Sequence, residues 1–505
     1  MFGDLGCLAA VWLARRLRRL LLRLRRSASS LPGAVALRLC PNLLARFGRA
    51  YAGRIVFVTG TNGKTTTTRL LAGLLRAGGR PVVTNEAGAN LLQGVATALI
   101  AAGRRPPAEA IAVLEVDEGV FPAAARALRP QAVIVTNLSP DQTDRYGSVE
   151  AVAERLRRGL AFVRPEGHVF LNADDPTVWS LREAAEAAGA RVHAYGFGRA
   201  TLGEAAEVRR PSGAAGEAIA GAETAETPAQ EADAAAGHVL ERGACPRCGA
   251  PLPFAAEGDG PGDYRCPACG FRRPEPEAAA EAAAVATDGL RFWLRIGDFA
   301  APVRLNAPAR YNIPNALAAA HAAHVLGVPP AALAAALERL DVTGPGRWER
   351  FFLPGDEAAT VVLVKNPAGA RAALEPLGKD PRRFAVVFVL NDRPADGADV
   401  SWIWAVPFER LEGHPGLVAV IAAGERADDA ALRFLYAGLG PLLFAAPEPE
   451  RAIAEGLRRL AAAGGGELYV LATYTALPAV RSALARRARP PGAPDERRGA
   501  DVLRA

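Results

Sequence analysis

The feature that most constrains the fold is a glycine-containing loop between an apolar run and a helix-like segment. Residues 55–58 (Ile-Val-Phe-Val) precede Thr59, Gly60, Thr61, Asn62, Gly63, Lys64, Thr65 and Thr66, and a segment rich in leucine follows. Strand, glycine loop and helix in this order are typical of a phosphate-binding loop, because glycines let backbone N–H groups point at phosphates and the helix N-terminus favours negative charge. We expect Lys64 to contact the phosphates and a hydroxyl of Thr65 or Thr66 to ligate Mg²⁺.

The chain contains very few lysines. Of 60 basic residues only Lys64, Lys365 and Lys379 are lysines, so arginine carries nearly all of the positive charge. A lysine in such a chain offers a compact ammonium group that arginine does not. We therefore expect Lys64 and Lys365 to be functional, with a plain surface position as the alternative for Lys365.

The positive charge is concentrated near the N-terminus. Residues 15–26 hold seven arginines, and the formal net charge of the whole chain is +7, so the rest is close to neutral and does not indicate nucleic-acid binding. The apolar run 8–14 is too short to span a bilayer, and the arginines follow it, unlike those of a signal peptide. We expect residues 1–50 to form a basic amphipathic segment of a cytoplasmic protein.

Two interpretations of this segment remain open. The side chains Leu17, Leu20, Leu21 and Leu24 share one face of a helix with arginines opposite them. Such a helix suits the anionic inner surface of the cell membrane, and it equally suits packing against the next domain.

Short apolar runs alternate with helical stretches from about residue 53 to 200. The runs end in polar residues, which is typical of a parallel α/β sheet whose ligands gather at the carboxyl ends of the strands. After the loop, strands are expected at residues 82–84, 111–115, 132–137 and 168–172. Strands of a second α/β unit are expected at 360–364, 384–390, 417–422 and 467–471.

These patterns predict the domain organisation. An ATP-binding α/β domain is expected over 51–343, a second α/β domain over 344–488 and a disordered tail over 489–505. Residues 200–240 and the acidic, alanine-rich residues 274–287 are expected to be flexible linkers. They flank an insertion at 240–273.

The insertion carries two Cys-x-x-Cys pairs with seventeen residues between them. Cys245 and Cys248 form the first pair, Cys266 and Cys269 the second, and a glycine follows each pair. This spacing is typical of a tetrahedral Cys₄ zinc ribbon, in which no coordination position stays open for catalysis. Disulfides are the alternative, and a reducing cytoplasm disfavours them.

Several motifs together resemble the Mur ligase family of ATP-dependent amide-bond-forming enzymes. The loop has the family's short glycine spacing, and Glu115 resembles its Mg²⁺-binding Glu. Asn137 resembles a family Asn, and residues 141–147 resemble the family's Asp-His-x-Asp segment, although Gln142 replaces the His. Asn312 resembles the residue that touches adenine, and Arg347 lies in a run that resembles the turn before the C-terminal domain. Each residue could instead have a structural role, such as a helix cap, but their joint order favours the family.

The resemblance implies a Mur-type fold, ATP and Mg²⁺ as cofactors, and activation of a carboxylate. ATP would convert the carboxylate to an acyl phosphate, which an amine then attacks. The nucleotide would be bound by the loop residues 59–66 together with Glu115, Asn137, Asn312 and Arg347, and Mg²⁺ by Thr65 and Glu115.

The second α/β unit narrows the resemblance to the MurT family, the Mur-ligase-like subunits of lipid II isoglutaminyl synthase. Residues 364–369, 390–404 and 472–475 carry it, together with the cysteine insertion. It implies amidation of the D-glutamate α-carboxylate of lipid II to D-isoglutamine in peptidoglycan synthesis. Ammonia would come from a class I glutaminase subunit of the GatD type in a heterodimer.

The same resemblance assigns roles in the second unit. Asp396 would orient the catalytic His of the glutaminase, with Asp399 and Asp392 as alternatives, and any of the three could instead cap the turn at Ser401. Lys365 would bind the substrate carboxylate or phosphate.

Two other functions are compatible with parts of the sequence. A stand-alone Mur-type or folylpolyglutamate-type ligase would use an amino acid as the amine and need no glutaminase. A zinc-ribbon ATPase that binds nucleic acid would need a basic and aromatic surface on the ribbon, whereas acidic segments flank it.

Overall fold

The apolar runs expected as strands pair into two separate sheets in the computed structural model of the chain. The structure describes residues 5–24, 26–85, 89–103, 109–139, 148–198, 243–255, 263–286, 289–340, 346–354, 357–397 and 399–488. The chain divides into two compact units. The first comprises Met1–Ala284, Leu290–Asn306 and Arg310–Val342, and the second Val285–Gly289, Ala307–Ala309 and Thr343–Ala505.

The first unit is built on a nine-stranded sheet in the order β11-β10-β9-β6-β5-β4-β1-β3-β2. From β6 to β2 every neighbouring pair is parallel, as the sequence predicted. The strands are β1 (Ile55–Thr59), β2 (Val82–Thr84), β3 (Ile111–Glu115), β4 (Ala132–Val135), β5 (His168–Asn172), β6 (Arg191–Phe197), β9 (Ala278–Ala286), β10 (Gly289–Ile296) and β11 (Phe299–Leu305).

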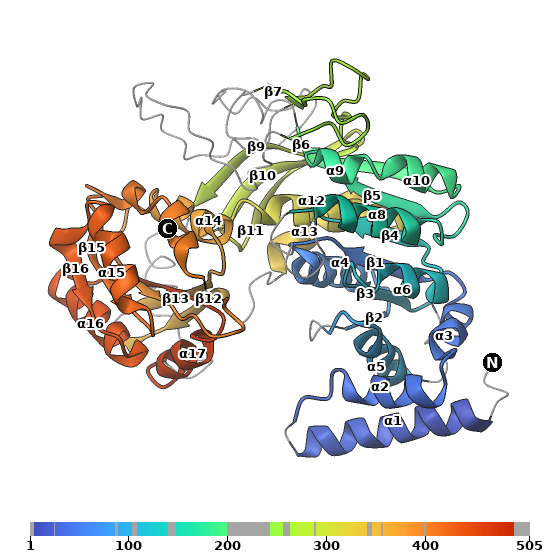
Figure 1. Cartoon of the computed structure of the whole chain (residues 1–505), viewed down its shortest axis with the longest axis horizontal. Coiled ribbons are helices and arrows are strands. Elements are labelled where there is room, and N and C mark those ends of the chain that lie inside the picture. The colour runs from blue at the N-terminus through green and yellow to red at the C-terminus, as the bar shows by residue number, and fades with distance from the viewer. Residues whose placement is uncertain are drawn as a thin grey trace, which may run out of the picture. The chain divides into compact units, whose positions relative to one another are not determined.

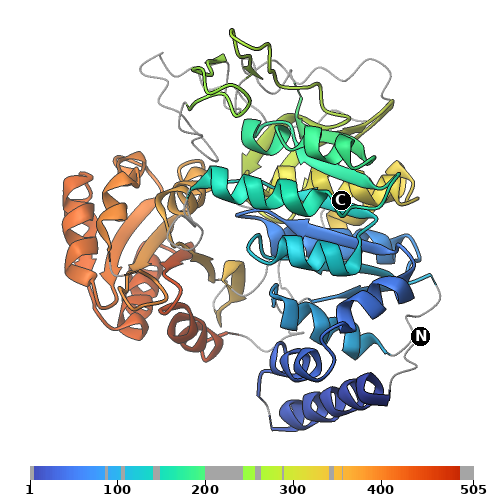
Figure 2. The same ribbon diagram turned by 45° about the vertical axis from the view of Figure 1, so that its right-hand side comes forward.

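Helices cover both faces of this sheet (Figure 1, Figure 2). One face carries α4 (Lys64–Ala77), α12 (Asn312–Val325) and α13 (Pro330–Arg339), which pack on one another. The opposite face carries α5 (Leu92–Ala102), α6 (Phe121–Leu128), α8 (Val149–Leu160), α9 (Pro176–Trp179) and α10 (Arg182–Ala187). Strands β1, β3 and β4 are therefore buried along their whole length, which explains their unbroken apolar sequences.

The predicted linker at 274–287 is wrong, because most of it is strand β9. Alanine and glutamate are poor strand formers, and their abundance suggested a linker. Strand β9 instead pairs with β6 in parallel, and Ala278, Ala279 and Ala280 are fully buried. Tertiary packing has overridden local propensity here.

The N-terminal segment is three helices, α1 (Leu5–Arg23), α2 (Leu31–Leu39) and α3 (Leu43–Tyr51). Helix α1 packs on α2 and α5 through Cys7, Ala10, Val11 and Ala14. The predicted apolar face is thus displaced, since Leu20 is exposed while Leu17 and Leu21 are half-buried. Cys7 and Cys40 form a disulfide that the sequence did not lead us to expect.

The cysteine insertion lies between β6 and β9, which are neighbours in the sheet. It contains a two-stranded sheet of β7 (Phe254–Ala255) and β8 (Asp263–Tyr264). Two buried contacts attach it to the end of β5: Tyr264 Oη donates to Ala173 O at 3.0 Å, and Arg273 forms an ion pair with Asp174 at 2.6 Å. Burial raises the pKa of the Asp174 carboxyl, and the Arg273 guanidinium opposes this shift.

The second unit is a six-stranded sheet in the order β12-β13-β17-β14-β15-β16, parallel except for β12 (Figure 1). Its strands are β12 (Arg347–Phe352), β13 (Ala358–Leu363), β14 (Phe384–Val389), β15 (Leu417–Ala423), β16 (Leu443–Ala445) and β17 (Glu467–Ala472). Its helices are α14 (Pro367–Leu377), α15 (Ala427–Tyr436), α16 (Pro449–Ala462) and α17 (Leu477–Ala485), with short 3₁₀ helices η3 (Ser401–Ala405), η4 (Phe408–Leu411) and η5 (Gly440–Leu442).

Four predicted features fall on residues that the structure does not describe. They are the segment 141–147 with Gln142, the whole linker 200–240, the turn at 344–345 and the tail 489–505.

Candidate functional site

The predicted phosphate loop follows β1 and leads into α4. Thr59 ends the strand and is fully buried, Lys64 is the first residue of the helix, and Thr65 and Thr66 lie in its first turn. Gly60 has φ +120° and Gly63 has φ +81°, values that favour glycine. A Cβ atom at Gly60 would overlap Thr136 Oγ1, and one at Gly63 would overlap Asn315 Oδ1, so both positions also require glycine for space.

Residues after β4 hold this loop in place. Asn137 Oδ1 accepts from Asn62 N at 3.0 Å, and Asn137 Nδ2 donates to Asn62 O at 3.0 Å. Thr136 Oγ1 also donates to Asn62 O, at 2.6 Å, and Thr61 Oγ1 accepts from Ser139 N at 3.1 Å. The side chain of Asn137, predicted to bind nucleotide, thus supports the backbone of the loop.

Lys64 is buried and its ammonium group has three partners. Lys64 Nζ donates to Gly60 O at 2.5 Å and to Thr61 O at 3.1 Å, and it forms an ion pair with Glu118 at 3.2 Å. Burial raises the pKa of Glu118, and the neighbouring Lys64 opposes that shift. Glu118 was not among the predicted site residues, although a second acidic residue three positions after Glu115, at a strand end, was a visible signal.

An acidic group lies beside the loop because β3 is the neighbour of β1. Val58 is level with Glu115 in the parallel pairing, so Glu115 emerges at the same edge of the sheet as the loop. Asn90 Nδ2 donates to Glu115 Oε1 at 3.0 Å, and Glu115, Asp117 and Glu118 are all buried. Carboxylates beside a phosphate loop are suitable Mg²⁺ ligands.

The N-terminus of α12 lies against the start of α4. Thr67 Oγ1 donates to Asn315 Oδ1 at 3.3 Å, and Asn312 is buried in the first turn of α12. The structure therefore places Asn312, Glu115 and the loop in one region of the first unit. Arg347, also predicted to bind nucleotide, is exposed at the first position of β12 in the second unit.

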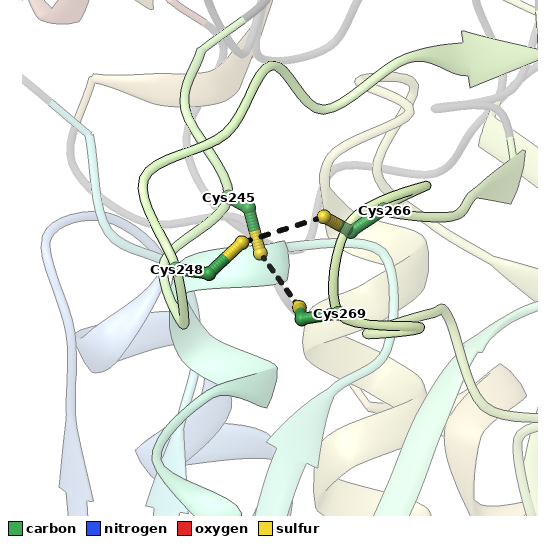
Figure 3. Close-up of side chains that lie close together, drawn as sticks. All are labelled: Cys245, Cys248, Cys266 and Cys269. Atoms are coloured by element: carbon green, nitrogen blue, oxygen red, sulfur yellow. Dashed lines mark hydrogen bonds between the residues drawn. The ribbon is translucent and has the colours of Figure 1, made fainter.

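The four cysteines of the insertion converge (Figure 3). Cys245 Sγ lies 3.6 Å from Cys269 Sγ, and Cys248 Sγ lies 3.6 Å from Cys266 Sγ. Zinc–sulfur bonds of about 2.3 Å in a tetrahedron place the sulfurs about 3.8 Å apart. Gly249 and Gly270 have φ of +74° and +72°, as the tight turn after each pair requires. The donor set and its spacing fit zinc.

In the second unit a polar cluster forms where β14 and β17 end. Asp396 accepts from Thr475 N at 2.8 Å with one carboxylate oxygen and from Thr475 Oγ1 with the other. Asn391 Nδ2 donates to Thr475 Oγ1 at 3.0 Å, and Asn391 N donates to Thr473 Oγ1 at 3.1 Å. Asp396 is half-buried.

The other candidates in this unit have different surroundings. Asp399 accepts from Ser401 N at 2.8 Å and so holds the turn that begins at Ser401, the structural alternative considered for it. Hydrogen bonds from the side chain and the backbone of Ser401 lower the pKa of Asp399. Asp392 pairs with Arg426 at 3.0 Å. Lys365 is exposed two residues after the end of β13 and next to Asn366, which caps α14.

Family models match both units of the chain. A Mur ligase middle domain matches residues 58–220, and a MurT ligase C-terminal domain matches residues 363–477. In the part of the chain that the structure describes, none of the helices combines the length and the apolar composition that a membrane span requires.

Solved Mur ligases share the fold. MurF from Acinetobacter baumannii superposes with a TM-score of 0.63 at 16% identity, over 90% of this chain and 81% of that one. MurF from Thermotoga maritima, solved in complex with ADP, gives a TM-score of 0.56 at 16% identity, over 88% and 84% of the two chains. These likenesses confirm the predicted Mur-type α/β fold.

A relative at higher identity covers almost the whole chain. The MurT subunit of the glutamine-hydrolysing lipid II isoglutaminyl synthase of Streptococcus pneumoniae is 30% identical over 474 residues, which is 91% of this chain and 93% of that protein. Together with the MurT C-terminal match, this identity shows that the chain belongs to the MurT family of Mur ligases.

Proposed function

We propose that the chain is the synthetase subunit of a lipid II isoglutaminyl synthase, which amidates the D-glutamate α-carboxylate of lipid II to D-isoglutamine with ammonia from glutamine. The observation that carries the proposal is the phosphate loop, with Lys64 and the acidic group at the end of β3, in a chain of the MurT family. A stand-alone amino-acid ligase and a nucleic-acid-binding ATPase lack comparable support.

The first unit supplies the groups for carboxylate activation. A substrate carboxylate oxygen forms a bond to the γ-phosphorus of ATP while the bond to the ADP oxygen breaks, and ammonia then displaces phosphate from the acyl carbon and loses a proton. Lys64 would leave Glu118 for the phosphate oxygens, and the loop N–H groups would stabilise their charge. Mg²⁺, held by Glu115 and Thr65, would neutralise phosphate charge.

Lys365 and Arg347 are proposed to act from the second unit. Lys365 would bind the substrate carboxylate or phosphate, since this exposed lysine lies near the end of β13. Arg347 would contact the nucleotide.

A separate glutaminase of class I, similar to GatD, is the proposed source of ammonia. The six cysteines of the chain are four in the quartet and two in a disulfide, which leaves none as a glutaminase nucleophile. The second unit also exposes large apolar side chains, including Trp404 and Tyr436, whose rings lie 5.3 Å apart edge-to-face. Aromatic side chains of this kind are enriched in protein interfaces.

Helix α1 is proposed to bind the anionic inner surface of the membrane that carries the lipid substrate. It lies on the side of α2 and α5 that faces away from the sheet (Figure 1, Figure 2). Its outward side exposes Leu5, Trp12, Leu13 and Leu20 together with Arg16, Arg19 and Arg23, and the helix has no acidic residue. This combination matches an interfacial helix.

Lys64→Ala should lower the rate of substrate-dependent phosphate release from ATP by at least about a hundredfold, because one donor to the transferring phosphoryl group is lost. Lys379→Ala, at an exposed lysine paired with Glu375, is the matched control and should retain activity. Circular dichroism would verify folding. Near-normal turnover of the Lys64 variant would overturn the proposed role.

Asp396→Asn should reduce glutamine-dependent amidation at least tenfold while ammonium-dependent amidation continues, because the carboxylate that would orient the partner's histidine is lost while the phosphate loop of the first unit is unchanged. Asp399→Asn is the control and should retain both activities. Full glutamine-dependent activity of the Asp396 variant would contradict the assignment.

Trp404→Ala should instead weaken assembly with the glutaminase, measured by size-exclusion chromatography.

Cys248→Ser should abolish the zinc that a mercurial thiol reagent releases from the purified protein, because three thiolates hold a structural zinc poorly. Cys40→Ser lies outside the quartet and should release the same zinc as the wild type. Wild-type protein that releases no zinc would refute the site.

Replacing Arg16 and Arg19 by Gln should weaken binding to phosphatidylglycerol-containing vesicles roughly 30-fold, since each arginine contributes about 1 kcal/mol at an anionic surface. The control replaces the exposed Arg38 and Arg49, on α2 and α3, and should bind like the wild type. Vesicle flotation measures the effect. No binding by the wild type, or equal loss in both variants, would exclude the interfacial helix.

A further inference from the structure

Three of the six histidines of the chain gather with one glutamate in the first unit, away from the cysteine quartet. His168 begins β5, His193 lies in β6, Glu277 directly precedes β9 and His321 lies in α12. In the sheet register Phe170 is level with His193, so both side chains emerge on the face that α12 covers. Elements from four distant parts of the chain thus bring these groups together.

The three potential ligand atoms are close to the spacing of a bound metal. His193 Nδ1 lies 2.9 Å from Glu277 Oε2, and His321 Nε2 lies 3.5 Å from the same oxygen. One ligand atom of each residue lies within 4.8 Å of the others. Zinc–nitrogen and zinc–oxygen bonds of about 2.0–2.2 Å in a tetrahedron separate the ligands by about 3.4 Å. Small rotations of these three side chains would bring their ligand atoms to the distances of a bound cation.

The surroundings resemble those of a metal-binding histidine. His193 Nε2, the nitrogen that faces away from Glu277, lies 3.0 Å from His168 Nδ1. A histidine that binds a metal through one nitrogen generally donates the proton of the other, and His168 can accept it. Phe170 stacks on His193 with ring centres 4.9 Å apart and contacts His321 edge-to-face at 5.3 Å, which forms an apolar wall.

We propose that His193, Glu277 and His321 bind a divalent cation of the zinc class. The two imidazole nitrogens are borderline ligands, and with them the set favours Zn²⁺ over Mg²⁺ or Ca²⁺, although the carboxylate oxygen alone would suit either of those ions. The Glu277 side chain is about half exposed, so water can complete the coordination. The inference does not depend on the proposed amidation reaction.

Such a cation would link α12 to β6 and to the start of β9. The backbone of Glu277 is itself fixed, because Glu277 N donates to Ala194 O at 2.9 Å. His321 follows Asn312 by nine residues, about 13.5 Å along the helix, and the N-terminus of α12 contacts the start of α4 at the phosphate loop. The cation would act as a positioning element for the helix that borders the nucleotide site.

Hydrogen bonds alone are the alternative, with both imidazoles donating to the Glu277 carboxylate. The two possibilities differ in one measurable respect. The hydrogen-bonded cluster predicts no saturable metal binding beyond the cysteines, whereas the metal site predicts one further equivalent.

The test uses the full-length protein with zinc still bound at the cysteines. Co²⁺ is titrated into this protein in a buffer that contains excess Mg²⁺ and no other added metal. The Mg²⁺ occupies oxygen-only sites such as the acidic group at the end of β3. The wild type should bind one Co²⁺ and develop weak visible d–d bands, without the intense near-ultraviolet sulfur-to-metal transitions of a thiolate site. Zn²⁺ should displace the Co²⁺ and raise the melting temperature.

His193→Ala should lose this spectrum, and Glu277→Gln, which keeps the size of the side chain, should weaken binding at least about tenfold. The matched control is His324→Ala, because His324 lies on the same helix outside the cluster and contacts Val328 O. If the wild type shows no saturable binding, or if Glu277→Gln and His193→Ala bind like His324→Ala, the metal site is excluded. Circular dichroism of each variant separates lost binding from lost folding.

Discussion

The buried parallel pairing of β1 with β3 on one side and β4 on the other determines where the polar groups of the nucleotide site lie. Each of these strands is covered on both faces, so its polar residues can appear only at its ends. The loop follows β1, the acidic group that begins with Glu115 ends β3, and Thr136 and Asn137 follow β4. A buried lysine without a partner would be unfavourable, because its charge would be removed from water. Glu118 and two loop carbonyls stabilise the buried Lys64.

The same arrangement gives the loop a defined shape. Gly60 and Gly63 adopt left-handed conformations and lie too close to Thr136 and Asn315 to tolerate a side chain. Hydrogen bonds from Asn137 and Thr136 then fix the loop backbone on its other side. Preorganised donors of this kind stabilise charge in a transition state without rearranging during the reaction.

The sequence predicted the strands of both sheets well where they were apolar and continuous, because burial on two faces leaves a clear pattern. It failed at β9, where alanines are buried between neighbouring strands and the composition suggested a linker. It also missed β6, whose alternating polar residues include His193. Glu118 was overlooked because its pairing with Lys64 depends on which strands are neighbours.

The phosphate loop, the cysteine quartet and the family are predictable from the amino-acid sequence alone, because each depends on the local spacing of a few residue types. How the remaining groups combine depends on tertiary contacts. The tertiary structure paired Arg273 with Asp174, held Asp396 against Thr475 while Asp399 capped a turn, and brought His193, Glu277 and His321 together. These partners are distant in the chain, and only strand order and helix packing set the distances between them.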